Sequence, residues 1–133
     1  MKTKTIKQTA TFAATPGEIY HLLMDSKKHA AFTGSKVTMS TKVNGKFSVF
    51  DGYAHGYNIG LIEGKKIVQA WHFAEGGWPD DHYSMCTFLL EPVGNKTKLS
   101  FIQTGVPEDS SAELKKGWKQ YYWEAIKTYL FTT

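Results

Sequence analysis

Hydrophobic and polar positions alternate over residues 5–13, which is the period of a strand with one buried face. The same period recurs over residues 36–104, where turn residues such as Asn44 and Gly45 separate the apolar runs. Strands that follow one another through tight turns pair with their neighbours in antiparallel fashion. The pattern therefore predicts one strand at the start of the chain and, further on, an antiparallel meander.

Two short helices are predicted between the first strand and the meander. Thr15, Pro16 and Glu18 mark the start of the first helix. The backbone amides in the first turn of a helix have no partner within the helix. A threonine cap and a glutamate three residues later accept hydrogen bonds from such amides, and a proline in the first turn has no amide hydrogen to satisfy. The second helix covers residues 26–31 and ends near Gly34. The predicted order before the meander is therefore strand, helix, helix.

The segment from Ser110 to about Leu130 returns to a helical period. Ser110 and Glu113 have the spacing of a second capping box. A helix with an apolar face must bury it, so we expect an α+β domain in which one curved antiparallel sheet wraps around this long C-terminal helix. The residues on the predicted sheet-facing side are Leu114, Trp118, Tyr121, Tyr122, Ala125 and Tyr129.

A second apolar stripe, formed by Trp123, Ile126 and Leu130, lies on the opposite side of this predicted helix. A helix face in contact with solvent does not need tryptophan, so two interpretations stay open. Either neighbouring loops cover the stripe, or it is a surface with an aromatic anchor for a protein partner.

Composition narrows the class of protein without naming a function. With 133 residues the chain is long enough for one domain with its own core, which we place at residues 1–133. The single Cys86 excludes a disulfide framework and cysteine-based metal cages. No apolar run has the length of a membrane span, and the N-terminus lacks the apolar stretch of a signal peptide. We therefore expect a cytoplasmic protein.

Charge and histidine spacing argue against several kinds of partner. The net charge is +4, but the lysines are scattered among acids and the chain has no arginine, so we expect no nucleic-acid binding. The histidines do not have the spacing of a metal site. No catalytic triad, phosphate loop or dinucleotide fingerprint can be assembled. We therefore expect no metal and no cofactor, and we favour a non-catalytic protein.

Two glutamines stand in the register of large apolar residues. Gln69 shares a strand face with Trp71 and Phe73, and Gln103 shares one with Phe101. A buried amide needs hydrogen-bond partners. These partners are either protein groups or the polar end of a ligand in an apolar pocket, and both alternatives stay open.

A non-catalytic module that binds a hydrophobic small molecule or lipid between helix and sheet is the first hypothesis. The predicted ligand-binding residues are Gln69, Trp71, Phe73, Met85, Phe101, Gln103, Trp118 and Tyr122. An alternative is a cyclase-like or isomerase-like enzyme acting on a hydrophobic substrate. In that case His55 or His72 would carry the proton, provided that its ring faces the pocket.

Five segments, spread in order over nearly the whole chain, match the pattern of a known family. They are Gly45-Lys46-Phe47, Ile67-Val68-Gln69-Ala70-Trp71, Trp78-Pro79 through His82-Tyr83-Ser84, Gln103-Thr104-Gly105-Val106-Pro107 and Gly117-Trp118-Lys119-Gln120-Tyr121-Tyr122-Trp123. The chain resembles the C-terminal-type domain of activators of the heat-shock protein 90 ATPase.

The resemblance implies the START-like helix-grip fold of the SRPBCC superfamily, which often encloses a hydrophobic cavity. It also implies a co-chaperone role in the stress response, with a heat-shock protein 90 chaperone as partner. The protein would be a monomer or a homodimer. No catalytic residue of the superfamily can be carried over to this sequence, and fold alone does not decide function.

Overall fold

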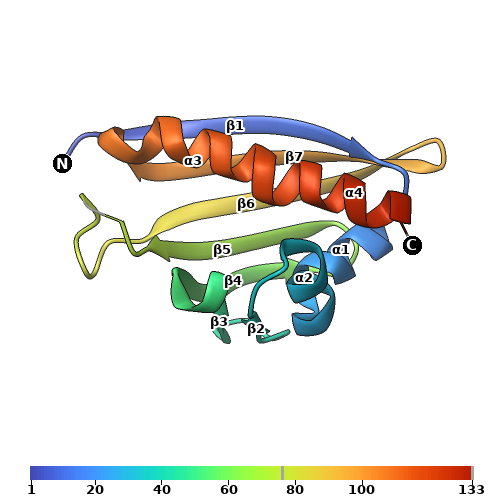
Figure 1. The fold of residues 1–133 in the computed structure, drawn as a ribbon, viewed down its shortest axis with the longest axis horizontal. Coiled ribbons are helices and arrows are strands. Elements are labelled where there is room, and N and C mark those ends of the chain that lie inside the picture. The colour runs from blue at the N-terminus through green and yellow to red at the C-terminus, as the bar shows by residue number, and fades with distance from the viewer. Residues whose placement is uncertain (76, 133) are drawn as a thin grey trace.

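The computed structural model describes residues 1–75 and 77–132. Within these residues seven strands form one antiparallel sheet, and a long helix crosses its inner face (Figure 1). The strands are β1 (Thr3–Phe12), β2 (Thr38–Met39), β3 (Lys46–Val49), β4 (Ala54–Ile62), β5 (Lys66–Phe73), β6 (Ser84–Val93) and β7 (Lys96–Pro107). The predicted α+β architecture, with a curved antiparallel sheet around a C-terminal helix, is confirmed.

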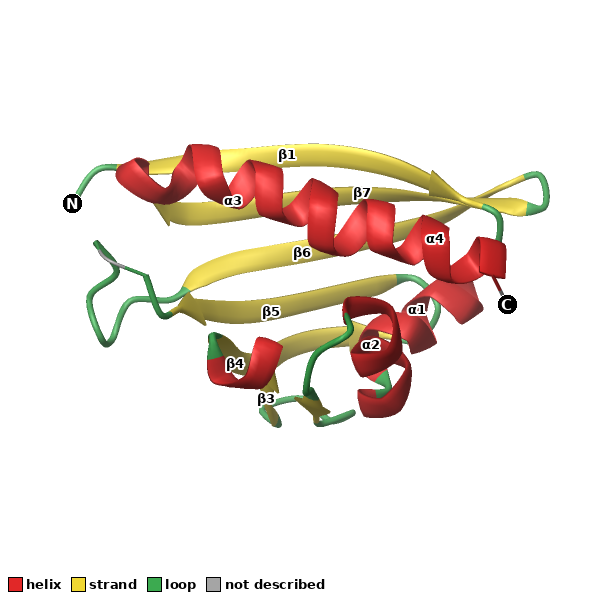
Figure 2. Ribbon diagram, viewed as in Figure 1, coloured by secondary structure: helices red, strands yellow, loops and turns green. Residues whose placement is uncertain are grey.

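The helical segments lie before, within and after the meander. They are α1 (Pro16–Met24), α2 (Ser26–Thr33), the 3₁₀ turns η1 (Phe50–Gly52) and η2 (Glu108–Ser110), α3 (Ser111–Trp118), the π-helical η3 (Lys119–Trp123) and α4 (Glu124–Thr132). Figure 2 shows α3 and α4 as one continuous rod across the strands. No described helix is long and apolar enough to cross a bilayer.

The sheet order is β1-β7-β6-β5-β4-β3-β2, so the strands from β2 to β7 are neighbours in the order of the chain. β1 closes the other edge by pairing with β7. Between β1 and β2 the chain crosses from one edge of the sheet to the other through α1 and α2, and α2 packs against α4. The sequence predicted the meander because turn residues separate its strands, although the connection from β5 to β6 is a longer loop.

The first helix begins as the sequence predicts. The Thr15 side chain accepts a hydrogen bond from the Glu18 amide at 3.2 Å, and the Glu18 carboxylate accepts one from the Thr15 amide at 3.2 Å. α2 ends at Gly34, whose φ of 70° is the left-handed conformation that glycine adopts without steric cost. Both predicted helix ends near the N-terminus are therefore confirmed.

The predicted capping box at Ser110 and Glu113 is wrong. The Ser110 backbone is helical, and its side chain makes no capping hydrogen bond. The hydroxyl instead accepts a hydrogen bond from Trp78 Nε1 at 3.1 Å. The indole lies in the loop after β5, so the serine ties that loop to the start of the long helix.

A π-helical turn in the middle of the long helix changes which side chains face the sheet. An α-helix turns by about 100° per residue, so the extra residue in the wider turn rotates every later side chain by about that angle. Trp123 and Ile126, which the ordinary spacing places on the outer side, are 4% and 0% exposed. Leu130 also packs against the core. The predicted outward stripe therefore does not form: Trp123 packs on Phe88 and Phe101 of the sheet, and α4, which carries Ile126 and Leu130, packs against α2.

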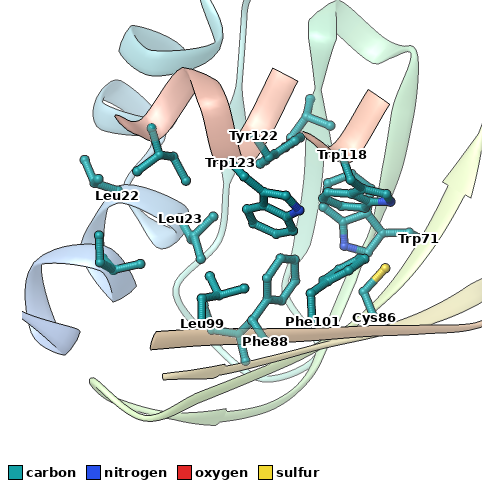
Figure 3. Packing of buried hydrophobic residues seen from close by; sticks show 14 of the residues in the cluster. Leu22, Leu23, Trp71, Cys86, Phe88, Leu99, Phe101, Trp118, Tyr122 and Trp123 are labelled. Carbon is teal, nitrogen blue, oxygen red and sulfur yellow. The ribbon is translucent and has the colours of Figure 1, made fainter. Parts of the chain in front are cut away.

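The core is a stack of aromatic rings between the long helix and the sheet. Trp118 lies 4.4 Å from Phe101 and 5.0 Å from Trp71, measured between ring centroids. Trp123 stacks on Trp118 at 5.8 Å and reaches Phe101 at 5.3 Å. Figure 3 shows both tryptophans projecting from the helix toward the sheet. Aromatic rings of the helix and aromatic rings of the sheet thus pack against one another and hold the helix on the sheet.

Gly56 in β4 is needed for close strand packing. A Cβ at this position would lie 1.7 Å from the Ala70 carbonyl oxygen, which is a backbone atom that cannot rotate away. It would also lie 2.9 Å from the Phe47 ring. Only glycine fits at this point of the sheet.

Candidate functional site

A cleft of about 450 Å³ opens between the first half of the long helix, η1 and the end of β5. Its floor is buried: Trp71 is 1% exposed, Trp118 3% and Tyr122 3%. Its mouth reaches solvent at Tyr121, which is 50% exposed. The lining residues are Phe50, Tyr53, Trp71, Phe73, Glu75, Glu113, Leu114, Gly117, Trp118, Tyr121 and Tyr122.

The structure brings some of the predicted ligand-binding residues together at this cleft. Trp71, Phe73, Trp118 and Tyr122 all line it. Phe101 lies beneath Trp118 and is 1% exposed, so it supports the floor from below. A cleft between helix and sheet is therefore present, lined by four of the eight predicted residues and by others that the sequence did not indicate.

Met85 is on the wrong face for a pocket residue. It is 47% exposed, whereas its chain neighbours Ser84 and Cys86 are 1% and 0% exposed. Side chains of a strand alternate between the two faces of the sheet, so a shift of one residue decides which face a side chain is on. Met85 points away from the long helix, and the prediction that it lines the pocket is wrong.

Gln69 finds its hydrogen-bond partners inside the protein. Its carbonyl oxygen accepts from Trp71 Nε1 at 2.9 Å, and its amide nitrogen donates to the Asn58 side chain at 3.0 Å. Asn58 in turn donates to the Ser40 and Lys42 carbonyls at 2.8 and 2.9 Å. The chain of bonds fixes the indole of Trp71 and ties it to the loop before β3.

Gln103 repeats this arrangement. Its carbonyl oxygen accepts from Trp118 Nε1 at 2.8 Å, and its amide nitrogen donates to the Ser84 hydroxyl at 2.9 Å. Neither Gln103 nor Gln69 lines the cleft. Of the two interpretations left open by the sequence, the structure supports protein partners: the glutamines orient tryptophans and do not reach a ligand.

A third glutamine holds the remaining tryptophan of the long helix. Gln8 on β1 accepts from Trp123 Nε1 at 2.6 Å and donates to the Lys115 carbonyl at 3.0 Å. A buried indole N–H without a partner is costly, so each bond also selects one orientation of its ring. The aromatic stack is therefore positioned by polar contacts as well as by packing.

Tyr122 is oriented by a buried histidine of α2. His29 Nδ1 lies 2.9 Å from the Leu23 carbonyl oxygen, which only accepts, so Nδ1 carries the proton. Nε2 then accepts from the Tyr122 hydroxyl at 2.8 Å. Burial lowers the pKa of His29 to about 4, and burial raises the pKa of Tyr122 well above its usual value. Both groups are neutral at pH 7.

Seven lining residues of the cleft lie outside the predicted ligand set: Phe50, Tyr53, Glu75, Glu113, Leu114, Gly117 and Tyr121. The Tyr53 hydroxyl donates a hydrogen bond to the Glu75 carboxylate. Burial, followed by the hydrogen bond to Glu75 and its charge, raises the pKa of Tyr53. Phe50 has a positive φ of 50°, which is uncommon for a bulky residue. Phe50 and Tyr53 lie between β3 and β4, and the fold brings them to the cleft beside the long helix.

The sequence model of the "Activator of Hsp90 ATPase homolog 1-like protein" family matches residues 13–130. The chain belongs to this family. The human "Activator of 90 kDa heat shock protein ATPase homolog 1" is 31% identical over 92% of this chain and 35% of its own length. The Dictyostelium discoideum homologue is 33% identical over 94% of this chain and 32% of its own length. The chain thus spans about a third of the length of these curated relatives.

Solved structures agree with the family assignment. An HSP90 activator from Plasmodium falciparum superposes with a TM-score of 0.88 at 26% identity, and the match covers 95% of both chains. A Mesorhizobium loti protein superposes with a TM-score of 0.82 at 20% identity over 98% of both chains, which bears on the fold alone. The START-like helix-grip fold implied by the resemblance is confirmed.

In this family member the two strand histidines do not face the cleft. His55 and His72 pair across β4 and β5 with ring centroids 5.0 Å apart. Both lie on the outer face of the sheet, because their strand neighbours Trp71 and Phe73 face the long helix. Burial, followed by the charge of His72, lowers the pKa of His55. The suggested proton-carrying role in the pocket is therefore wrong for both rings.

The outer face of the sheet carries exposed apolar side chains next to these histidines. Tyr57 is 39% exposed, Ile59 37%, Tyr83 38% and Met85 47%. The Tyr57 and Tyr83 rings are 5.6 Å apart, and Ala70 lies between Tyr57 and Met85 in the strand register. We call Tyr57, Ile59, Tyr83 and Met85 the outer patch. It faces away from the cleft.

Proposed function

We propose that this chain is a co-chaperone that stimulates the ATPase activity of an Hsp90-type chaperone. The observation that carries the proposal is the likeness to the Plasmodium falciparum HSP90 activator, which covers 95% of both chains. Its solved chain therefore has the size and fold of this one. The names of the curated relatives support the same function.

The outer patch is the surface best suited to dock a protein. Large apolar side chains that gather on one exposed face are typical of interaction sites, and tyrosine is enriched among the residues that anchor interfaces. Lys46 lies directly across from Tyr57 on the same outer face, and Lys66 projects from it on β5. An apolar centre with lysines at its edge fits a chaperone surface whose own apolar centre is edged by acids.

The proposal is tested by titrating the chaperone with this protein and measuring steady-state ATP hydrolysis. We expect the rate to rise severalfold and to saturate. The double variant Tyr57→Ser/Met85→Ser should lose most of the stimulation, while its circular dichroism spectrum stays that of the wild type.

Val93→Ser is the matched control, because Val93 is 53% exposed but lies at the far end of β6, outside the outer patch. It should stimulate as the wild type does. A chaperone rate that does not change at saturating protein would refute the proposed function. Full stimulation by the double variant would refute only the docking surface.

A second function is supported by the cleft: the binding of a small hydrophobic molecule. Its volume of about 450 Å³ is within the range of small-molecule sites, and its floor is aromatic. Gly117 lines the cleft from the helix, and a Cβ there meets nothing closer than 3.9 Å. Gly117→Leu should therefore fill the cleft without disturbing the helix, since leucine has a higher helix propensity than glycine.

The test compares the wild type with Gly117→Leu in binding tert-butylbenzene, followed through the tryptophan indole signals by NMR. We expect the wild-type signals of Trp71 and Trp118 to shift in a saturable way, because both rings line the cleft. The same titration of Gly117→Leu should leave them in place. Equal shifts in the two proteins would contradict binding in the cleft.

A further inference from the structure

The charges at the cleft are opposite in sign to the charge of the whole chain. The protein has 16 lysines, 12 acidic residues and a net charge of +4. The described residues that line the cleft include Glu75 and Glu113 but no lysine and no histidine. The cleft is therefore a local region of negative charge on a basic protein.

The polar hydrogens of the floor are already used. The indole N–H groups of Trp71 and Trp118 donate to Gln69 and Gln103, and the Tyr122 hydroxyl donates to His29. At the wall, the Tyr53 hydroxyl donates to the Glu75 carboxylate. An anionic or acceptor group entering the floor would find none of these four donors free.

The residues that line the cleft can still offer hydrogen-bond acceptors and aromatic ring faces to a ligand. A carboxylate has several acceptor positions, so Glu75 retains some after binding Tyr53, and the Glu113 side chain is exposed at the mouth. The faces of tryptophan, tyrosine and phenylalanine rings carry negative electrostatic potential and attract cations. The carboxylates and the aromatic ring faces therefore both favour a ligand that carries a positive charge.

We propose that the cleft selects organic cations, namely ammonium or quaternary ammonium groups attached to an apolar body. This rests on the proposed binding of small hydrophobic molecules in the cleft. The apolar body packs on the floor formed by Trp71, Trp118 and Tyr122, and the positive group lies toward the mouth between Glu75 and Glu113. The aromatic walls and the two carboxylates together hold the charge.

The experiment compares two probes of nearly the same shape that differ in charge. Phenyltrimethylammonium carries a permanent positive charge, and tert-butylbenzene is its neutral isostere. Dissociation constants are measured by NMR titration of the full chain. We expect the cation to bind at least tenfold more tightly than the neutral probe, and added salt to narrow the difference, since screening weakens exposed charges.

Three variants locate the effect. Glu75→Gln removes the charge but keeps an acceptor for the Tyr53 hydroxyl. Glu113→Gln removes the charge of the exposed carboxylate at the mouth. Each should weaken binding of the cation severalfold and leave the neutral probe unchanged. Gly117→Leu should abolish binding of both probes.

Equal affinities for the two probes would overturn the inference and leave the cleft a site for neutral molecules. Binding of neither probe would overturn both proposals. Cation binding that survives Gly117→Leu, or that is unchanged in Glu75→Gln and Glu113→Gln, would place the cation elsewhere on the surface and would also overturn the inference.

Discussion

The buried His29 makes stability depend on pH in a direction that the structure fixes. The ring is 1% exposed and stacks on Phe32 at 4.9 Å, and both nitrogens are hydrogen-bonded in the neutral form. A second ring proton would point at the Tyr122 hydroxyl, which now donates to that nitrogen. Protonation would therefore reverse this bond, leave the hydroxyl hydrogen without its acceptor and bury a charge.

The magnitude follows from linkage. In the unfolded chain this histidine titrates near pH 6.5, whereas burial lowers the pKa to about 4 in the folded protein. Between these values the unfolded state binds a proton that the folded state does not, so the free energy of unfolding falls as the pH falls. The full difference amounts to about 3 kcal/mol, present above pH 6.5 and lost on approaching pH 4.

Urea unfolding, followed by tryptophan fluorescence at pH 7 and at pH 4, measures this loss. His29→Asn keeps a donor near the Leu23 carbonyl but cannot be protonated in this range, so the variant should lose up to about 3 kcal/mol less than the wild type on acidification. His21→Asn, at an exposed histidine of α1, is the control and should behave as the wild type. An identical pH dependence in wild type and His29→Asn would show that His29 does not cause the loss of stability in acid.

Three further substitutions test the packing, each by urea unfolding. Trp118→Ala should cost ~3–5 kcal/mol because the ring is 3% exposed in the aromatic stack, and a loss below ~1 kcal/mol would place it outside the core. Gln103→Leu should cost about 2 kcal/mol because it leaves the Trp118 indole without an acceptor; an unchanged stability would show that the bond is dispensable. Gly56→Ala should cost about 3 kcal/mol because its Cβ would clash with the Ala70 carbonyl, and a neutral effect would contradict the close strand approach.

The periodicity of the sequence was sufficient for the strands, the meander and the Thr15 cap, because these depend on neighbours along the chain. It failed at the long helix. The spacing rule assumes a uniform turn, and the π-helical segment at Lys119–Trp123 breaks that assumption. Trp123 and Ile126 are buried for this reason. In the sequence, the placement of Trp123 on the predicted outer side was a sign that the uniform spacing fails there.

The cleft was predicted only in part for a different reason. Register placed Gln69 and Gln103 among apolar residues, but the sequence could not say whether their partners were protein or ligand. Glu75 and Glu113 come from a loop after β5 and from the long helix, which meet only in the folded protein. No local pattern brings such residues together. The charge of the cleft is therefore a product of tertiary structure.

We propose different roles for the two faces of the sheet: the outer patch would dock a chaperone, and the cleft on the inner side would bind a small molecule. Ile59 and Met85 belong to the outer patch, and Leu114 lines the cleft. Methyl NMR of the labelled protein during addition of the Hsp90-type chaperone tests this division directly. We expect the Ile59 and Met85 methyl signals to shift or broaden while the Leu114 signals stay in place. Unperturbed spectra, or changes confined to Leu114, would contradict it.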